Sequence, residues 1–332
     1  MKKQNFSQFI GIDVSKSTFD VALISSENQT TSHVFENTLN GMKAFFKMLK
    51  SQHIALSDCF VCMEYTGVYG KIIIAKLVEK QVALCVEMPL KILRSQGLQR
   101  GKNDKIDAIR IAKYASKNYQ ELELYKPCPK ILEKIKLLMN VRSQLVKNKT
   151  DLMKYPNELK NSDAELYKLA MKTIEEPLKT YDKKIKEIEK EVEQLISSEE
   201  ELKKVIHLAS SVVGVGKLTA IYLCCFTHIF TRYKNAKQLA CYCGVVPFEH
   251  SSGSSVRKRP KVHHMANKVL KKQLHMCAMS AIQHDPEIRV YYHRKLEEGK
   301  HKMLVINNVR NKLVQRICVV VRNEKPYVKK VA

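Results

Sequence analysis

Short apolar runs alternate with polar turns over the first 128 residues. Residues 9–24 form two apolar runs around a polar turn, which is the pattern of a β-hairpin. Further runs typical of strands cover 32–35, 59–65 and 82–88. Apolar residues at helical spacing cover 40–50, 71–80 and 104–117. Strands in hairpin order, followed by strands alternating with helices, predict an α/β domain with a mixed sheet over residues 1–128.

The helix expected at 104–117 is amphipathic. Its buried face is predicted to consist of Ile106, Ile109, Ala112 and Ala115, which recur at helical spacing.

Residues 129–205 predict a helical spacer. The segment contains no glycine, and apolar residues three or four apart lie among alternating charges, which is a coiled-coil or helical-hairpin pattern. Pro156 and Pro177 are expected to kink or break it. Its balanced charge favours a spacer or an oligomerisation arm, so we expect a homo-oligomer, dimer or tetramer.

Residues 206–332 predict a basic, mainly α-helical third domain. Gly214 and Gly216 lie between two apolar helical segments, as in helix-hairpin-helix DNA binders, where backbone N–H groups at a helix N-terminus receive a phosphate. A plain tight turn would give the same pattern. Residues 236–243 are expected to be helical, residues 250–261 (HSSGSSVRKRPK) to form a polar, basic loop, and the chain from about 264 to be helical again.

The net charge of +25 indicates a polyanionic partner, for which nucleic acid is the usual choice. Residues 201–332 carry 25 Lys and Arg against 7 Asp and Glu, so most phosphate contacts are expected there. No signal peptide and no apolar stretch of about 18 residues are found. We therefore expect a cytoplasmic protein without membrane contact, associated with the bacterial nucleoid when it acts, with reduced cysteines.

Four acids are candidates for a metal centre. Asp13 and Glu64 each end an apolar strand, and Asp104 and Asp107 lie three residues apart on one helix face. Carboxylate oxygens on rigid elements suit Mg²⁺ or Mn²⁺, and two such ions can promote phosphodiester displacement. Taken singly, Asp104 could cap its helix and Asp107 could be a solvated surface charge.

These acids, in this order, make the chain similar to the DEDD transposases of bacterial insertion sequences in the family numbered one hundred and ten, which includes pilin-gene invertases. The matching N-terminal segments are FIGIDVSKSTFDVAL, MEYTGVYG and GKNDKIDAIRIA. The matching C-terminal segments are VVGVGKLTAIYL and NAKQLACYCGVVPFEHSSG.

The resemblance implies a RuvC-like domain of RNase H type in which Asp13, Glu64, Asp104 and Asp107 bind divalent metal. It also implies a serine that attacks donor and target DNA, here Ser251 with Ser252 as the reserve, and a structured guide RNA that supplies sequence choice. The residues expected to contact nucleic acid are Gly214, Gly216, Lys217, Arg257, Lys258, Arg259 and Lys261. After Gly253 the chain lacks the glycines usual in the family, which changes the loop but keeps the serine.

Three other functions fit parts of the pattern. A metal-dependent junction nuclease would use the acids and leave Ser251 idle. A sugar-kinase-like ATPase also opens on a strand that carries an Asp, but it needs glycines where Val14, Ser15 and Lys16 stand here. A non-catalytic nucleic-acid-binding protein would rest on the Gly214/Gly216 hairpin alone.

Overall fold

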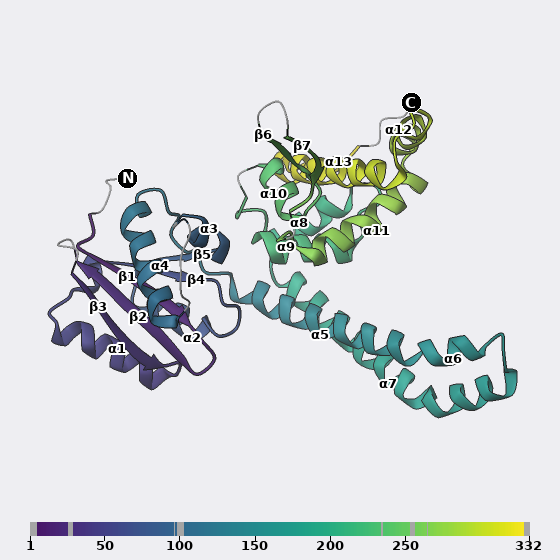
Figure 1. Cartoon of the computed structure of the whole chain (residues 1–332). Coiled ribbons are helices and arrows are strands. Elements are labelled where there is room, and N and C mark those ends of the chain that lie inside the picture. Colours follow the sequence, from purple (N-terminus) through teal and green to yellow (C-terminus); the bar gives the residue numbers. More distant parts are fainter. Residues whose placement is uncertain are drawn as a thin grey trace. The chain divides into compact units, whose positions relative to one another are not determined.

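The fold is that of a computed structural model, which describes residues 5–25, 29–95, 97, 103–233, 235–252, 256–263 and 265–328. For 249–252 and 256–261 it describes the backbone alone. The chain divides into two compact units, Met1–Pro127 and Cys128–Ala332 (Figure 1).

The first unit is built on a five-stranded mixed sheet in the order β3-β2-β1-β4-β5. Its strands are β1 (Gln8–Val14), β2 (Thr18–Ser25), β3 (Thr30–Glu36), β4 (Cys59–Glu64) and β5 (Ala83–Glu87). β1, β2 and β3 pair in antiparallel fashion, whereas β4 is parallel to both β1 and β5. The predicted hairpin and the predicted mixed α/β sheet are confirmed.

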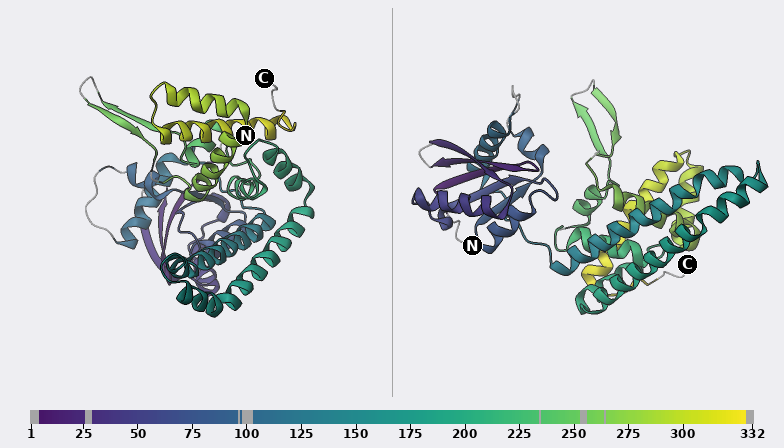
Figure 2. Two further views of the ribbon diagram at one scale, coloured as in Figure 1. Left: turned by 90° about the vertical axis from the view of Figure 1, so that its right-hand side faces the viewer. Right: turned by 90° about the horizontal axis from the view of Figure 1, so that it is seen from below.

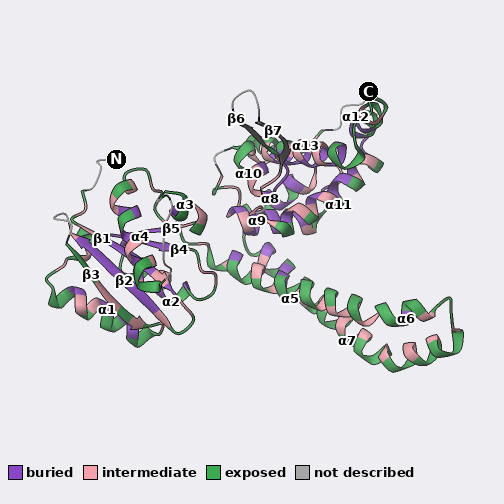
Figure 3. Cartoon of the chain, in the orientation of Figure 1, coloured by how far each residue is buried: buried purple, intermediate pink, exposed green. Residues whose placement is uncertain are grey.

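Helices cover both faces of this sheet (Figures 1 and 3). They are α1 (Leu39–Ser51), α2 (Lys71–Glu79), α3 (Pro89–Arg94) and α4 (Asp104–Asn118). Because successive strand residues point to opposite faces, Ile10 and Ile12 pack with Phe45 of α1, whereas Phe9 packs with α4. Each face therefore has an apolar core of its own.

The buried face of α4 differs from the predicted one. Its buried residues are Ala108, Ile111, Ala112, Tyr114 and Ala115, whereas Ile106 keeps 40% of its surface exposed. The cause lies in β1: a Cβ on Gly11 would come within 2.2 Å of both Ala108 O and Ala112 N. The helix rests directly on a glycine, and this contact sets its rotation.

The second unit begins with a helical arm (Figure 2). It consists of α5 (Lys130–Leu152), α6 (Lys154–Leu159) and α7 (Ala164–Ser197). Arg142 pairs with Glu189 at 2.8 Å and Lys149 with Asp182 at 2.5 Å, so α5 and α7 run antiparallel. The helical hairpin, one of the two predicted forms, is what the arm adopts.

Only one of the two prolines interrupts the arm. A break follows α5 at Met153, and Pro156 lies in the first turn of α6, where a missing N–H is tolerated. Pro177 lies inside α7, which is continuous for 34 residues, so the prediction of a break there is wrong. Pro177 is exposed, and solvent can hydrate the carbonyl that loses its helical partner.

Six further helices complete the second unit: α8 (Glu200–Ser210), α9 (Lys217–Thr227), α10 (Ala236–Tyr242), α11 (Lys268–His284), α12 (Pro286–Glu297) and α13 (Lys302–Asn323). They share one apolar core with the base of the arm, to which α5 contributes Leu132, Ile135 and Met139. The predicted spacer, residues 129–205, and the predicted third domain, residues 206–332, thus pack together in one unit.

The segment expected as a polar loop is instead a β-hairpin. β6 (Phe248–Ser252) pairs in antiparallel fashion with β7 (Val256–Lys261). This polar and basic stretch can pair in this way because the ladder is formed by backbone N–H and C=O groups.

No helix in the described part of the chain is long and apolar enough to cross a membrane. All ten cysteines are free thiols in the structure.

Candidate functional site

Asp13 lies next to the last residue of β1, on the face that α4 covers. Its Oδ1 accepts a hydrogen bond of 3.0 Å from the Val14 backbone N–H. Burial, and then the negative charges of Asp104 and Asp107, raise the pKa of Asp13 from 3.8 to about 6. Among the described residues, the charged neighbours that act on Asp13 are all carboxylates, so none of them supplies a counter-charge.

The start of α4 carries two of these neighbours. Asn103 caps the helix by accepting a hydrogen bond from Lys105 N–H, so Asp104 is not the cap but belongs to the first turn. The contact between α4 and Gly11 brings this turn to the β1 end where Asp13 lies. Asp107 is held by Arg110 in an ion pair of 2.7 Å.

Glu64 ends β4, the strand beside β1. Ile12 is opposite Met63 in the parallel β1–β4 pairing, so Asp13 and Glu64 follow at neighbouring positions on the same face. The backbone therefore brings Asp13 and Glu64 together at the C-terminal ends of β1 and β4, and Asp104 and Asp107 lie on α4, which covers this face.

Two further acids, which the sequence analysis missed, lie beside Asp13 and Glu64 and extend them into a row of carboxylates across the strands. Asp20 on β2 is directly opposite Asp13, and Glu87 on β5 is directly opposite Glu64. Asp20 is only 8% exposed, and burial together with Asp104 raises its pKa. Four neighbouring strands thus each present one carboxylate to the α4 face. The signal lay in the hairpin pairing, which places Asp20 across from Asp13.

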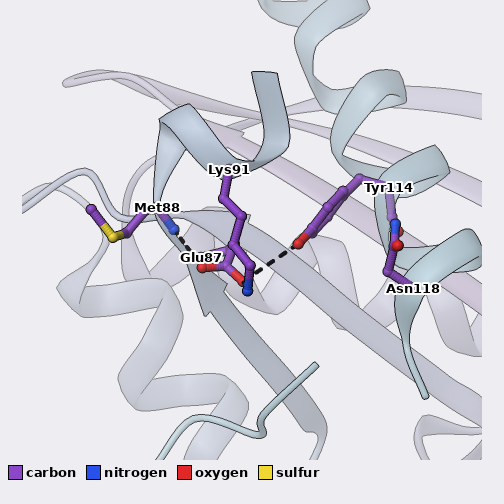
Figure 4. Close-up of polar contacts among 5 residues, drawn as sticks. All are labelled: Glu87, Met88, Lys91, Tyr114 and Asn118. Carbon is purple, nitrogen blue, oxygen red and sulfur yellow. Dashed lines mark hydrogen bonds and ion pairs between the residues drawn. The ribbon is translucent and has the colours of Figure 1, made fainter. Parts of the chain in front are cut away.

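Basic, hydroxyl and backbone groups hold Glu87 (Figure 4). Lys91 of α3 pairs with it at 2.6 Å, and the Tyr114 hydroxyl of α4 lies 3.5 Å from the same oxygen. Its second oxygen accepts a hydrogen bond of 3.0 Å from the Met88 backbone N–H. The positive charge of Lys91 balances the negative charge of Glu87, and this ion pair connects α3 to the last carboxylate of the row.

The donor set suits a hard divalent cation, since it consists of carboxylates on strands and on one helix turn, with repulsion at Asp13 that a cation would relieve. The side chains are not gathered into a coordination shell. Among the described residues, no three His, Cys, Asp or Glu side chains are placed to hold a metal ion. Only Oδ1 of Asp107 is bound to Arg110, so its second oxygen could join a shell.

The two glycines of the second unit have different surroundings. Gly214 has a φ of +88°, and a Cβ there would approach Ala281 Cβ of α11 to 2.7 Å, so both conformation and packing require glycine. Gly216 caps the N-terminus of α9 and has open space around it. Lys217 pairs with Glu193 of α7. The turn is thus built in part for packing onto α11.

The candidate serines lie on β6. Ser251 is opposite Arg257 and Ser252 opposite Val256 in the hairpin register, and Lys258, Arg259 and Lys261 follow along β7. The backbone therefore sets both serines across from the start of the basic strand. Their side chains, like those of β7, lie outside the described part of the structure.

Comparison with known proteins gives the same picture in both halves of the chain. Residues 10–159 match a family model for DEDD transposases of the IS110 kind, described as "Transposase". Residues 206–293 match a second model, described as "Transposase IS116/IS110/IS902 family".

Individual relatives agree with these matches. The pilin gene-inverting proteins of Moraxella bovis and Moraxella lacunata are each 26% identical over 346 residues, covering 97% of this chain and 98% of the relative. An uncharacterised protein of insertion element IS110 from Streptomyces coelicolor is 30% identical over 105 residues, which is 31% of this chain and 26% of that protein.

Proposed function

Because the chain belongs to the IS110 family of transposases and is a DNA transposase or recombinase, we propose that it cuts and rejoins strands through a metal centre and a serine nucleophile. The observation that carries the proposal is the placement of Asp13, Glu64 and the first turn of α4 at one edge of a mixed sheet. We further propose that this first unit is a RuvC-like domain of RNase H type.

Asp13, Glu64, Asp104 and Asp107 would hold the divalent cations. Bound there, Mg²⁺ or Mn²⁺ would supply charge neutralisation at the phosphate and activation of an attacking oxygen. Asp13 sits on a buried strand and is fixed by the Val14 N–H, so it gives the centre its rigid anchor. Asp107 is held by Arg110, whose guanidinium balances the acid until a cation is bound.

Ser251 is the proposed nucleophile, with Ser252 in reserve. Its hydroxyl oxygen would replace one ester oxygen of the phosphodiester, and the departing strand end would take up the proton that the hydroxyl gives up. The phosphoserine intermediate is again a phosphodiester, so the hydroxyl end of another strand can attack its phosphorus, release the serine and rejoin the DNA. Arg257, Lys258, Arg259 and Lys261 would bind the flanking phosphates.

Nucleic-acid partners follow from the charge. We propose that the chain binds donor and target DNA, and that a structured guide RNA supplies the choice of sequence by base pairing. Gly214, Gly216 and Lys217 are proposed to form a helix-hairpin-helix contact with phosphate at the start of α9. The arm of α5 and α7 is proposed to join copies of the chain.

The proposal is tested by trapping the covalent intermediate. The full chain is incubated with Mg²⁺, the guide RNA and a labelled DNA target, then denatured and resolved by size. We expect a labelled protein–DNA adduct with the unaltered chain, none with Ser251→Ala, and none with Asp13→Asn. An adduct with Ser251→Ala but not with Ser252→Ala moves the role to Ser252. Metal-dependent cleavage without any adduct would make the chain a junction nuclease.

A further inference from the structure

Arg310 of α13 is a buried cation that has no acidic partner among the side chains that the structure describes. Its residue is only 6% exposed, and its Nε has no hydrogen-bond partner in the described part of the chain. Burial lowers its pKa, and no carboxylate among the described residues opposes that shift. A buried charge without a partner is costly, so such groups are ordinarily paired with an acid or an anionic ligand.

The acids of the second unit that the structure describes near α13 are engaged elsewhere. Asp285 and Glu287 both pair with Arg316 at 2.7 Å. Glu324 pairs with Lys204 at 2.5 Å. With only 7 acids against 25 Lys and Arg, residues 201–332 have few carboxylates to offer a buried guanidinium.

The one polar partner of Arg310 among the described side chains is His275 of α11. The Arg310 Nη2 lies 2.6 Å from His275 Nδ1. Because a guanidinium can only donate, Nδ1 accepts, and the imidazole is neutral with its proton on Nε2. Burial and the Arg310 charge lower the pKa of His275, in agreement with a neutral ring. The half-buried imidazole thus keeps a second donor, its Nε2–H.

This pair lies on the side of α13 that faces the start of the β6–β7 hairpin. Asn307, one turn before Arg310 on the same helix face, donates its side-chain amide to Val245 O at 2.8 Å, and β6 begins three residues later. On α11, Lys271 and Lys272 precede His275 by one turn and share its face. The surroundings of the pair are therefore basic.

We propose that Arg310 and His275 form a binding site for one backbone phosphate of nucleic acid, beside the base of the β6–β7 hairpin. The site rests on the proposed function only in taking its phosphate from DNA or RNA. Arg310 supplies the charge, His275 orients it and adds a donor, and Lys271 and Lys272 attract the polyanion. A bound phosphate would supply the negative charge that no described side chain provides to Arg310.

The first test uses inorganic phosphate and thermal unfolding of the full chain. At equal ionic strength, sodium phosphate should raise the midpoint above that in sodium chloride by about 2–4 °C, because a ligand stabilises the state that binds it. Arg310→Met should lose this response yet keep or raise the midpoint in chloride, since a buried unpaired charge is gone. Arg310→Lys should recover part of the response. Arg322→Met, at the exposed end of the same helix, is the matched control and should keep all of it.

Two results would overturn the site. One is an unchanged phosphate response in Arg310→Met. The other is a lowered midpoint in chloride for Arg310→Met, which would mean that the guanidinium already has a stabilising partner within the protein.

The second test measures binding of a labelled DNA duplex and a labelled RNA hairpin across a salt series. Arg310→Met should weaken binding by about tenfold and reduce the salt slope by about one phosphate. A loss with DNA alone, or with RNA alone, identifies the source of the phosphate, and no loss with either rejects the site. Neither test requires strand cleavage, so the failure of this site and the failure of the proposed recombinase are distinguishable.

Discussion

Asp13 on β1 faces Asp20 on β2 directly across the antiparallel pair, and α4 covers both. The register puts two acids at adjacent positions in a partly buried layer, with Asp104 acting on the pKa of each. Such an arrangement costs stability as long as no cation is present. The electrostatics of this layer therefore yield measurable consequences.

Stability without metal should depend on the charge of Asp13. Its pKa of about 6 in the folded chain, against 3.8 as the ordinary value, means that the folded state holds the proton more tightly between these values. Stability should fall as the pH rises from about 4 to 6 and stay reduced above that. At pH 7.5 in chelator, Asp13→Asn should be more stable by about 1–2 kcal/mol after allowance for solvent screening.

Chemical denaturation of the two proteins at several pH values measures this difference. It should vanish below about pH 4, where the wild-type carboxyl is also neutral. A wild-type chain that is the more stable at pH 7.5 would mean that Asp13 has a favourable partner.

Gly11→Ala should damage the fold and the site together. The new methyl group would meet Ala108 O and Ala112 N at 2.2 Å, both backbone atoms that cannot turn aside. We expect a loss of about 1–3 kcal/mol in unfolding free energy, with α4 pushed away from β1. Gly70→Ala is the control, because its nearest contacts, at 3.0 and 3.1 Å, are the side-chain atoms Met63 Cε and Thr66 Oγ1. Equal stability of the two variants would refute the close packing.

Glu64 and Glu87 should differ in their effect on catalysis although they are neighbours in register. The charge of Glu87 is already balanced by Lys91, and its side chain also contacts the Tyr114 hydroxyl, so we expect that Glu87 is not a metal ligand. Glu64→Gln should lower the recombination rate by about 100-fold or more, and Glu87→Gln by less than about tenfold. Single-turnover rates at saturating Mg²⁺ give the comparison, and the reverse order would make Glu87 the ligand.

Loss of the Ser251 hydroxyl should separate nucleic-acid binding from strand joining. Ser251→Ala removes only a hydroxyl from β6, so nucleic-acid affinity should stay within about twofold while strand joining is lost. Anisotropy with labelled DNA measures the first quantity and a joining assay the second. Loss of affinity in parallel with joining would give Ser251 a role in binding rather than attack.

Sequence periodicity was sufficient for the five strands and the three longer helices of the first unit, because each has a run long enough to show its period, whereas the six-residue α3 was not predicted. It was not sufficient for the rotation of α4. Ile106 and Ile111 both fit a helical stripe, and only the backbone contact at Gly11 selects Ile111 for burial. Asp20 was not predicted as a site residue for a similar reason. Its position opposite Asp13 depends on the strand register, which is set by a turn closed by Ser15 and Thr18.

The β6–β7 hairpin shows a second limit. Its residues carry no apolar alternation and their composition favours a loop, yet the backbone pairs as a hairpin. Pro177 likewise reads as a helix breaker, whereas an exposed two-helix arm tolerates it. In each case the deciding contact is made by backbone or solvent, which side-chain patterns do not record.

Titration of the full chain with Mn²⁺ at pH 7.5, followed by electron paramagnetic resonance of the free ion, tests most directly whether this acidic edge is a metal centre. The unaltered chain should withdraw Mn²⁺ from solution, Asp13→Asn and Glu64→Gln should each withdraw far less, and Glu36→Gln on the edge strand β3 should behave as the unaltered chain does. Equal Mn²⁺ uptake by all four proteins would contradict the account.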